Sequence, residues 1–188
     1  MSSTTFFQAP VEEKVEPGAD CLVCTAAIHP RKRVLELAEA AIIAQVPVWI
    51  IGKPYAESDS YYRRFLEVQK GHPELIRYEG GISDRTRLAQ IYRQARGFVL
   101  LSTMESLSLS ALEAAASKRP LLLTDLPWAR TVFGDDAAYA TGSMHPESLA
   151  PILRRFFENA PSMKSSFKPL NWDEVAERFQ ALYTKMLG

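Results

Sequence analysis

Apolar residues follow two alternating patterns along the chain, short continuous runs and longer stretches with helical spacing. The short runs predict buried strands, which we place at residues 21–27, 46–51, 75–78, 98–101 and 120–123, with a weaker one at 137–140. Apolar residues three and four positions apart predict helices at residues 31–44, 58–70, 85–95, 106–117, 146–159 and 172–187. Pro127 and Trp128 are expected in a loop.

The alternation of strands and helices predicts the fold class. Strands that are apolar along their whole length are typical of a mostly parallel sheet covered by helices on both faces. We therefore predict an α/β, doubly wound, Rossmann-like domain at residues 20–188, whose ligands bind at the carboxyl ends of the strands. Residues 1–19 lack periodicity and contain Pro10, Pro17 and Gly18, so we expect a linker or extended arm there.

The composition narrows the function classes. A chain of 188 residues suits one domain, and its 22 basic and 22 acidic residues give a formal net charge of zero. A chain without net positive charge does not attract the phosphates of nucleic acid over a distance, so we expect no nucleic-acid partner. The longest apolar stretch, residues 40–51, is too short for a membrane span, and the N-terminus has no signal-peptide pattern. We expect a cytoplasmic protein.

Several nucleotide-binding and catalytic motifs are excluded. The loop TAAIHPRKR after the first strand has no glycine, which excludes both the GxGxxG turn and the GxxxxGK phosphate loop, and no GxSxG elbow occurs. His29, His72 and His145 lack metal-ligand spacing, so we expect no metal. His72 and His145 are expected at the surface or at helix caps, whereas His29 follows the first strand, where a ligand contact is conceivable.

Cys21 and Cys24 form the run CLVC. A zinc site needs a second pair of ligands with similar spacing, and a thioredoxin-type motif begins a helix rather than a strand. We therefore expect the two cysteines to pack as small apolar residues in or near a buried strand.

Two carboxylates follow the strand at 98–101. Glu105 is expected in the loop past the strand end and Glu113 inside the next helix, with seven residues between them. Ser102 and Glu105 also fit a capping box, and Glu113 also fits a solvated helix residue. We expect Leu109, among others, to pack toward the sheet. The N–H groups at a helix N-terminus favour anions and can donate hydrogen bonds to a diphosphate. Carboxylates beside them can accept hydrogen bonds from sugar hydroxyls. The two together suit a sugar nucleotide.

The stretch MESLSLSALEAAASKRPLLLTD resembles the E-x7-E region of retaining glycosyltransferases with the GT-B fold, the group 1 family. The resemblance implies that Glu105 contacts the donor sugar and that Glu113 binds the ribose hydroxyls. HPRKRVLELAEA is similar to the phosphate-binding loop and helix of that family, which places Lys32 at the donor diphosphate. The similarity covers residues 20–187, the C-terminal domain of such an enzyme.

Two glycine turns extend the resemblance. VWIIGKPY is similar to the family's second strand and its turn at Gly52, and the segment from Ile76 through Gly81 to Ala95 is similar to the strand, turn and helix beside the nucleobase. We therefore include Gly52 and Gly81 in the candidate nucleotide-binding site.

The reaction implied by the resemblance is transfer of a sugar from a nucleoside diphosphate sugar to an acceptor, with retention of anomeric configuration. Lys32 and the amides near Ser108 and Leu109 would stabilise the leaving diphosphate, without a metal or other cofactor. In this family the acceptor site belongs to an N-terminal domain. A chain of 188 residues has room for one domain, so we expect an N-terminal acceptor domain or partner chain, and little or no activity without it.

The chain also departs from the family pattern. Ala26 and Ala27 stand where Gly-Arg is usual, Ser108 stands at a usual glycine, and Pro127, Trp128 and Arg130 replace a glycine-rich loop. Arg31 or Arg33 is a possible substitute for the missing arginine. These departures leave two alternatives open, a non-catalytic nucleotide-sugar-binding or interaction module, and an epimerase or phosphorylase with the same architecture.

Overall fold

The chain forms a parallel sheet, seen in a computed structural model that describes residues 20–164 and 166–187. Within these residues the sheet has six strands in the order β3-β2-β1-β4-β5-β6, and every neighbouring pair is parallel. The strands are β1 (Leu22–Thr25), β2 (Val48–Ile51), β3 (Ile76–Tyr78), β4 (Gly97–Leu100), β5 (Leu121–Thr124) and β6 (Ala138–Ala140). The arm expected at residues 1–19 lies outside the described residues.

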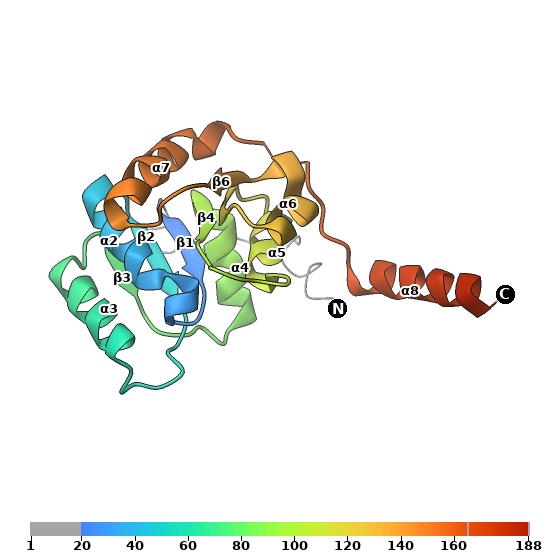
Figure 1. Ribbon diagram of the computed structural model, residues 1–188, viewed down its shortest axis with the longest axis horizontal. Helices are drawn as coiled ribbons and strands as arrows, with labels where there is room; N and C mark the ends of the chain where they lie inside the picture. Colours follow the sequence, from blue (N-terminus) through green and yellow to red (C-terminus); the bar gives the residue numbers. More distant parts are fainter. Residues whose placement is uncertain (1–19, 165, 188) are drawn as a thin grey trace.

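Helices cover both faces of this sheet (Figure 1). One face carries α2 (Val34–Ala44), α3 (Ser60–Gly71) and α7 (Pro146–Asn159), and the other carries α4 (Arg85–Gln94), α5 (Leu109–Ala116) and α6 (Pro127–Phe133). Successive side chains of a strand pack against opposite helix layers. In β1, Leu22 and Cys24 pack in the apolar cluster with α2, α3 and α7, and Val23 packs in the cluster with α4, α5 and α6. The predicted doubly wound, Rossmann-like fold is confirmed. Strands buried on both faces need a continuous apolar sequence, which is the pattern that predicted them.

Side chains at the helix N-termini explain where helices begin. Asp59 Oδ1 accepts a hydrogen bond from Tyr61 N at 2.9 Å and begins α3. Asp84 Oδ1 accepts from Thr86 N at 2.8 Å and from Arg87 N at 3.1 Å, which begins α4. Each cap satisfies N–H groups that have no partner within the helix.

The helix expected from residue 31 is divided into two elements. Pro30–Lys32 forms a short 3-10 turn, η1, and α2 begins only at Val34. Arg33 joins them with a left-handed backbone, φ 51°. Similarly, the helix expected from residue 106 begins at Leu109.

The loop expected at Pro127 and Trp128 is instead the start of α6, so that prediction was wrong. Pro127 occupies the first helical turn, where its missing N–H is not needed and its fixed φ suits the helix. Pro127 therefore marks the start of a helix here rather than a loop. Two further short turns, η2 (Gly134–Asp136) and η3 (Ala160–Ser162), follow α6 and α7.

Cys21 and Cys24 are buried with free thiols, 4% and 1% exposed, as predicted. Cys24 lies in β1 and Cys21 directly precedes it. Burial raises the pKa of each thiol to about 12. Both therefore remain protonated at neutral pH, and their packing is structural.

The last helix, α8 (Trp172–Leu187), projects away from the body of the domain (Figure 1), and none of its described residues is buried. The segment before α8, residues 166–171, is called the strap here and is nevertheless attached to the body of the domain. Asp136 Oδ1 accepts hydrogen bonds from Ser166 N at 2.6 Å and Phe167 N at 3.2 Å, and the Phe167 ring lies 4.8 Å from that of Phe133. Among the described residues, no helix is long and apolar enough to cross a membrane.

Candidate functional site

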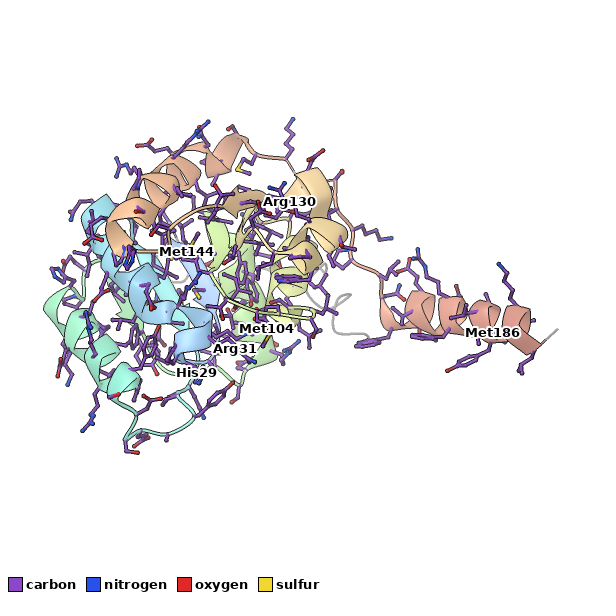
Figure 2. The ribbon with its side chains drawn as sticks, viewed as in Figure 1. His29, Arg31, Met104, Arg130, Met144 and Met186 are labelled. Atoms are coloured by element: carbon purple, nitrogen blue, oxygen red, sulfur yellow. The ribbon has the colours of Figure 1, made fainter. Side chains whose placement is uncertain are left out.

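Two loops meet at the carboxyl edge of the sheet, where the strand order reverses. β1 lies between β2 and β4, so the loop after β1 leads to one side of the sheet and the loop after β4 to the other. Thr103 N donates a hydrogen bond to Arg31 O at 2.8 Å, which joins the two loops. Figure 2 shows Arg31 and Met104 at this junction. Open α/β sheets bind ligands in the crevice at such a point.

Lys32 and Glu105 form an ion pair across these loops, although they are far apart in the sequence. Their side chains are only 16% and 11% exposed, so the pair is poorly screened by water. Ser102 Oγ donates to Glu105 Oε1 at 2.8 Å and fixes the carboxylate further. The capping-box alternative was wrong, because Ser108, not Ser102, is the N-cap residue of α5.

Glu113 lies in the second turn of α5 and is buried, with its side chain 10% exposed. The alternative of a solvated helix residue was therefore wrong. Arg85 Nη2 donates to Glu113 Oε1 at 2.8 Å, from the first residue of α4. A buried carboxylate needs such a cation.

Arg85 was missed in the sequence. The apolar neighbours of Glu113 in the sequence indicated that its carboxylate either reaches solvent or accepts hydrogen bonds, but no local spacing singles out Arg85 as the donor. The guanidinium is 52% exposed, so one positive charge is presented to solvent beside Glu113.

Ser108 begins α5 and is almost fully buried. Its Oγ accepts a hydrogen bond from Ala111 N at 3.3 Å and lies 3.1 Å from Ser110 Oγ. The hydroxyl is thus used to cap the helix. Leu109 is 62% exposed, and the expectation that it packs toward the sheet was wrong, because at the first helical position it points away from the face formed by Ala111 and Ala115.

Gly52 and Gly81 hold neighbouring loops together. A Cβ atom on Gly52 would lie 1.8 Å from Ala26 O, so the backbone after β1 approaches that after β2 too closely for any side chain. Gly52 N also donates to Gly80 O at 3.0 Å. A Cβ atom on Gly81 would lie 3.0 Å from the side chain of Lys53. Backbone packing therefore requires glycine at position 52, whereas at position 81 a side chain would meet only the flexible side chain of Lys53. Contact of either glycine with a nucleotide stays a prediction.

The three histidines lie at element ends. His29 Nδ1 accepts from Arg31 N at 3.2 Å and its ring lies 4.9 Å from that of Tyr55 (Figure 2). His72 and His145 occupy the C-cap of α3 and the N-cap of α7, as predicted. Within residues 20–164 and 166–187, no three His, Cys, Asp or Glu side chains group so as to hold a metal ion.

An apolar groove of about 560 Å³ borders this site. It lies between α5, α6 and the segment leading into α8, and Glu113 contributes the carboxylate in its lining. Its apolar walls include Leu109, Leu112, Phe167 and Trp172. The N-terminus of α8 is thereby brought beside the loop that carries Glu105.

Comparison with known proteins agrees with this arrangement. A family model described as "Glycosyl transferases group 1" matches residues 19–159. The serotype-specific mannosyltransferase WbdA of Escherichia coli is 27% identical over 137 residues, which cover 69% of this chain. The match spans only 16% of the length of WbdA.

Solved structures share the fold. The pneumococcal O-GlcNAc transferase GtfA, in complex with UDP and GlcNAc, matches 89% of this chain and 36% of its own, with 20% identity and a TM-score of 0.65. The C-terminal domain of the group 1 protein LpcC from Francisella tularensis matches 75% of this chain and 77% of its own, with 23% identity and a TM-score of 0.63. The Anabaena protein Alr3699/HepE, in complex with UDP-glucose, matches 85% of this chain and 47% of its own, with 16% identity and a TM-score of 0.63.

The sheet order and its helix layers are those of the C-terminal domains of GT-B glycosyltransferases. The family match extends over more than half of the sequence and includes both loops at the switch point as well as α5. This chain belongs to the group 1 glycosyltransferases.

Proposed function

We propose that this chain is the donor-binding domain of a retaining glycosyltransferase, which transfers a sugar from a nucleoside diphosphate sugar to an acceptor. The observation that carries the proposal is the placement of Glu105 and Glu113, one in the loop after β4 and one buried in α5, with Lys32 held beside the first. Their seven-residue separation is that of the E-x7-E motif. GtfA in complex with UDP and GlcNAc and HepE in complex with UDP share the fold of this chain, which supports a nucleotide as its ligand.

The charged and N–H groups at the carboxyl edge of the sheet can stabilise a diphosphate as the leaving group. In the proposed reaction Glu105 accepts hydrogen bonds from sugar hydroxyls and Glu113 accepts them from the ribose. Lys32 and the backbone N–H groups near Ser108 and Leu109 stabilise the negative charge that develops on the diphosphate oxygen. Because Lys32 already contacts Glu105, one cation lies close to both the sugar site and the diphosphate site.

The acceptor site is proposed to lie on an N-terminal domain or a partner chain. Two features support this division. α8 buries none of its described residues, and the groove between α5, α6 and α8 offers an apolar surface beside the site. The Gtf relative also occurs as a GtfA/B complex. We expect the chain alone to show little or no transferase activity.

Calorimetric titration with UDP, GDP, ADP and their sugar conjugates tests the donor site. We expect saturable binding of one nucleotide, weakened in Glu113→Ala by about 1–3 kcal/mol, the value of a lost charged hydrogen bond. Glu39→Ala is the matched control, since Glu39 is also a helical carboxylate paired with an arginine, Arg64 at 2.9 Å, on the opposite face of the sheet. Equal affinities in the two variants, or no nucleotide binding, would contradict the proposal.

A non-catalytic sugar-nucleotide-binding module is the second candidate. The observation in its favour is the absence of a charged side chain at Ala26 and Ala27, directly after β1. The two candidates differ in products. With an acceptor domain and acceptor supplied, transfer of the sugar supports the enzyme, whereas donor binding without turnover supports the module. Epimerised or phosphorolysed sugar would instead identify the third alternative.

A further inference from the structure

The C-terminal half of α8 carries an exposed apolar stripe with a basic edge. Phe179, Leu182 and Met186 are spaced three and four residues apart, so they lie on one side of the helix, and each is at least half exposed. Arg178 and Lys185, seven residues apart and both exposed, border this stripe along one edge. All three acids of α8 precede Arg178. The stripe is therefore bordered by positive charge alone.

Pairing of α8 with a second α8 does not compensate this basic edge. In an antiparallel pair of helices, one edge of an apolar stripe faces the same edge of the other helix, so Arg178 and Lys185 would meet like charges. In a parallel pair they would face the opposite edge, which carries Ala176 and Tyr183 and no charge. The surface that complements α8 must be apolar and acidic.

A groove of about 770 Å³ on the outer surface of α2, α3 and α7 has an apolar floor. Ile42 and Ile43 of α2 and Val68 of α3 contribute its aliphatic side chains. Ile43 is 53% exposed, and among the described residues of these three helices no other large apolar side chain is as open to solvent. The floor of the groove is therefore accessible to a partner.

The same groove is acidic, because four carboxylates and one guanidinium line it. Arg64 Nη2 donates a hydrogen bond to Glu39 Oε1 at 2.9 Å and neutralises it. Glu36, Glu67 and Glu147 form no ion pair with any residue in the described part of the chain. The groove thus has an excess of negative charge, although the formal net charge of the whole chain is zero.

The groove and α8 of one chain lie too far apart to meet. The strap is attached beside α6 through Asp136, on the sheet face opposite to α2, α3 and α7. From there α8 projects away from the body, at the end of the molecule remote from α3 (Figure 1). The helix that fills the groove must therefore come from another molecule.

We propose that the C-terminal half of α8 packs in this acidic groove of a second copy of the chain. The apolar stripe covers Ile42, Ile43 and Val68, and the basic edge faces the unpaired glutamates. Burial of the stripe supplies affinity, and the charges select the groove over a second α8. Each copy offers a helix and a groove, so association closes into a ring of copies or continues as a chain. The contact does not depend on the proposed function, and a domain that packs on α8 competes with it.

Sedimentation equilibrium of the complete chain tests the association. The groove lining also contains His72 and His145, so the measurement is made at pH 8, above the range in which histidines ordinarily titrate. We expect a mass that rises with protein concentration and falls with added salt. Leu182→Asp, in the middle of the stripe, should weaken the association at least about tenfold. A chain that remains monomeric at all concentrations would overturn the proposal.

Charge reversal identifies the two surfaces. Arg178→Glu/Lys185→Glu makes the edge of α8 acidic, and Glu67→Lys/Glu147→Lys makes the groove basic. We expect each double variant to associate at least about tenfold more weakly than the unsubstituted chain, because like charges then face each other. An equimolar mixture of the two variants should recover the association, since each then meets opposite charge on the other. All four positions are exposed, so both variants should keep nearly the same Tm.

Glu57→Lys/Glu158→Lys is the matched control, because it changes the net charge equally at exposed acids outside the groove. We expect it to associate like the unsubstituted chain. Undiminished association of the groove variant would overturn the proposal, as pairing of α8 with α8 would give that result. Equal weakening in the control and groove variants, or no recovery in the mixture, would overturn it as well, because the effect would then come from net charge.

Discussion

The body of the domain and α8 both carry large apolar side chains but differ in what they bury. In the body, Trp49 in β2 is 1% exposed and packs within an apolar cluster. In α8, Trp172 is 57% exposed and Phe179 is 55% exposed. The hydrophobic pattern predicts which face of a helix seeks a partner, but it does not say whether that partner is in the same domain. Three experiments test this contrast between the body and α8.

The largest effect is expected from removing a tryptophan. Trp49→Ala should lower the free energy of unfolding by about 3–5 kcal/mol, because it leaves a large cavity in the core. Trp172→Ala should change it by about 0.5 kcal/mol or less, as for an exposed residue. Urea denaturation of both variants measures the two values. Similar losses in the two variants would show that α8 is packed on the body in solution.

A smaller effect is expected from removing an arginine. Arg85→Ala leaves the buried carboxylate of Glu113 without its cation and should cost about 1–3 kcal/mol, reduced from a fully buried pair because Arg85 is 52% exposed. Arg178→Ala in α8, where the side chain is exposed, should cost about 0.5 kcal/mol or less. Thermal unfolding at matched pH compares them. A loss in Arg178→Ala as large as that in Arg85→Ala would break the contrast.

The smallest effect on stability near neutral pH concerns the thiols. Burial raises the pKa of Cys21 and Cys24 from 9.0 to about 12, so the folded state holds their protons more tightly than the unfolded state does. Their contribution to stability is therefore complete below pH 9 and is lost as the pH rises toward 12. At pH 8 we expect no labelling of native protein by iodoacetamide and full labelling in denaturant.

A cysteine placed on α8 gives the counterpart to the buried thiols. Thr184→Cys should be labelled at the rate of a free thiol, because the position is exposed. Protection of this cysteine in the isolated chain, or rapid labelling of Cys24, would contradict the described packing.

The strands could be predicted from the sequence because burial on both faces leaves a local signal. The run at 98–101, for example, corresponds to β4 at Gly97–Leu100. The start of α5 was misplaced, since Ser102 and Ser108 both resemble cap residues and only tertiary contacts choose between them. α6 was missed because a proline is compatible with both a loop and a first helical turn.

Within the candidate site, the individual acids and Lys32 could be chosen from the sequence, but their partners could not. The Lys32–Glu105 and Arg85–Glu113 pairs each join residues brought together by the sheet topology rather than by spacing along one helix. Likewise, nothing local distinguished Arg31 from Arg33. Arg33 lines a cavity formed by chain segments after β5 and β6, and Arg31 does not.

The anchoring of the strap by Asp136 has a consequence for association. α8 has 16 residues, which gives a length of about 24 Å. A protein that packs along it is held within that distance of the loop carrying Glu105. Its encounter with the donor site is then intramolecular, and its effective concentration there is set by the tether rather than by its abundance, on the order of millimolar for a short link.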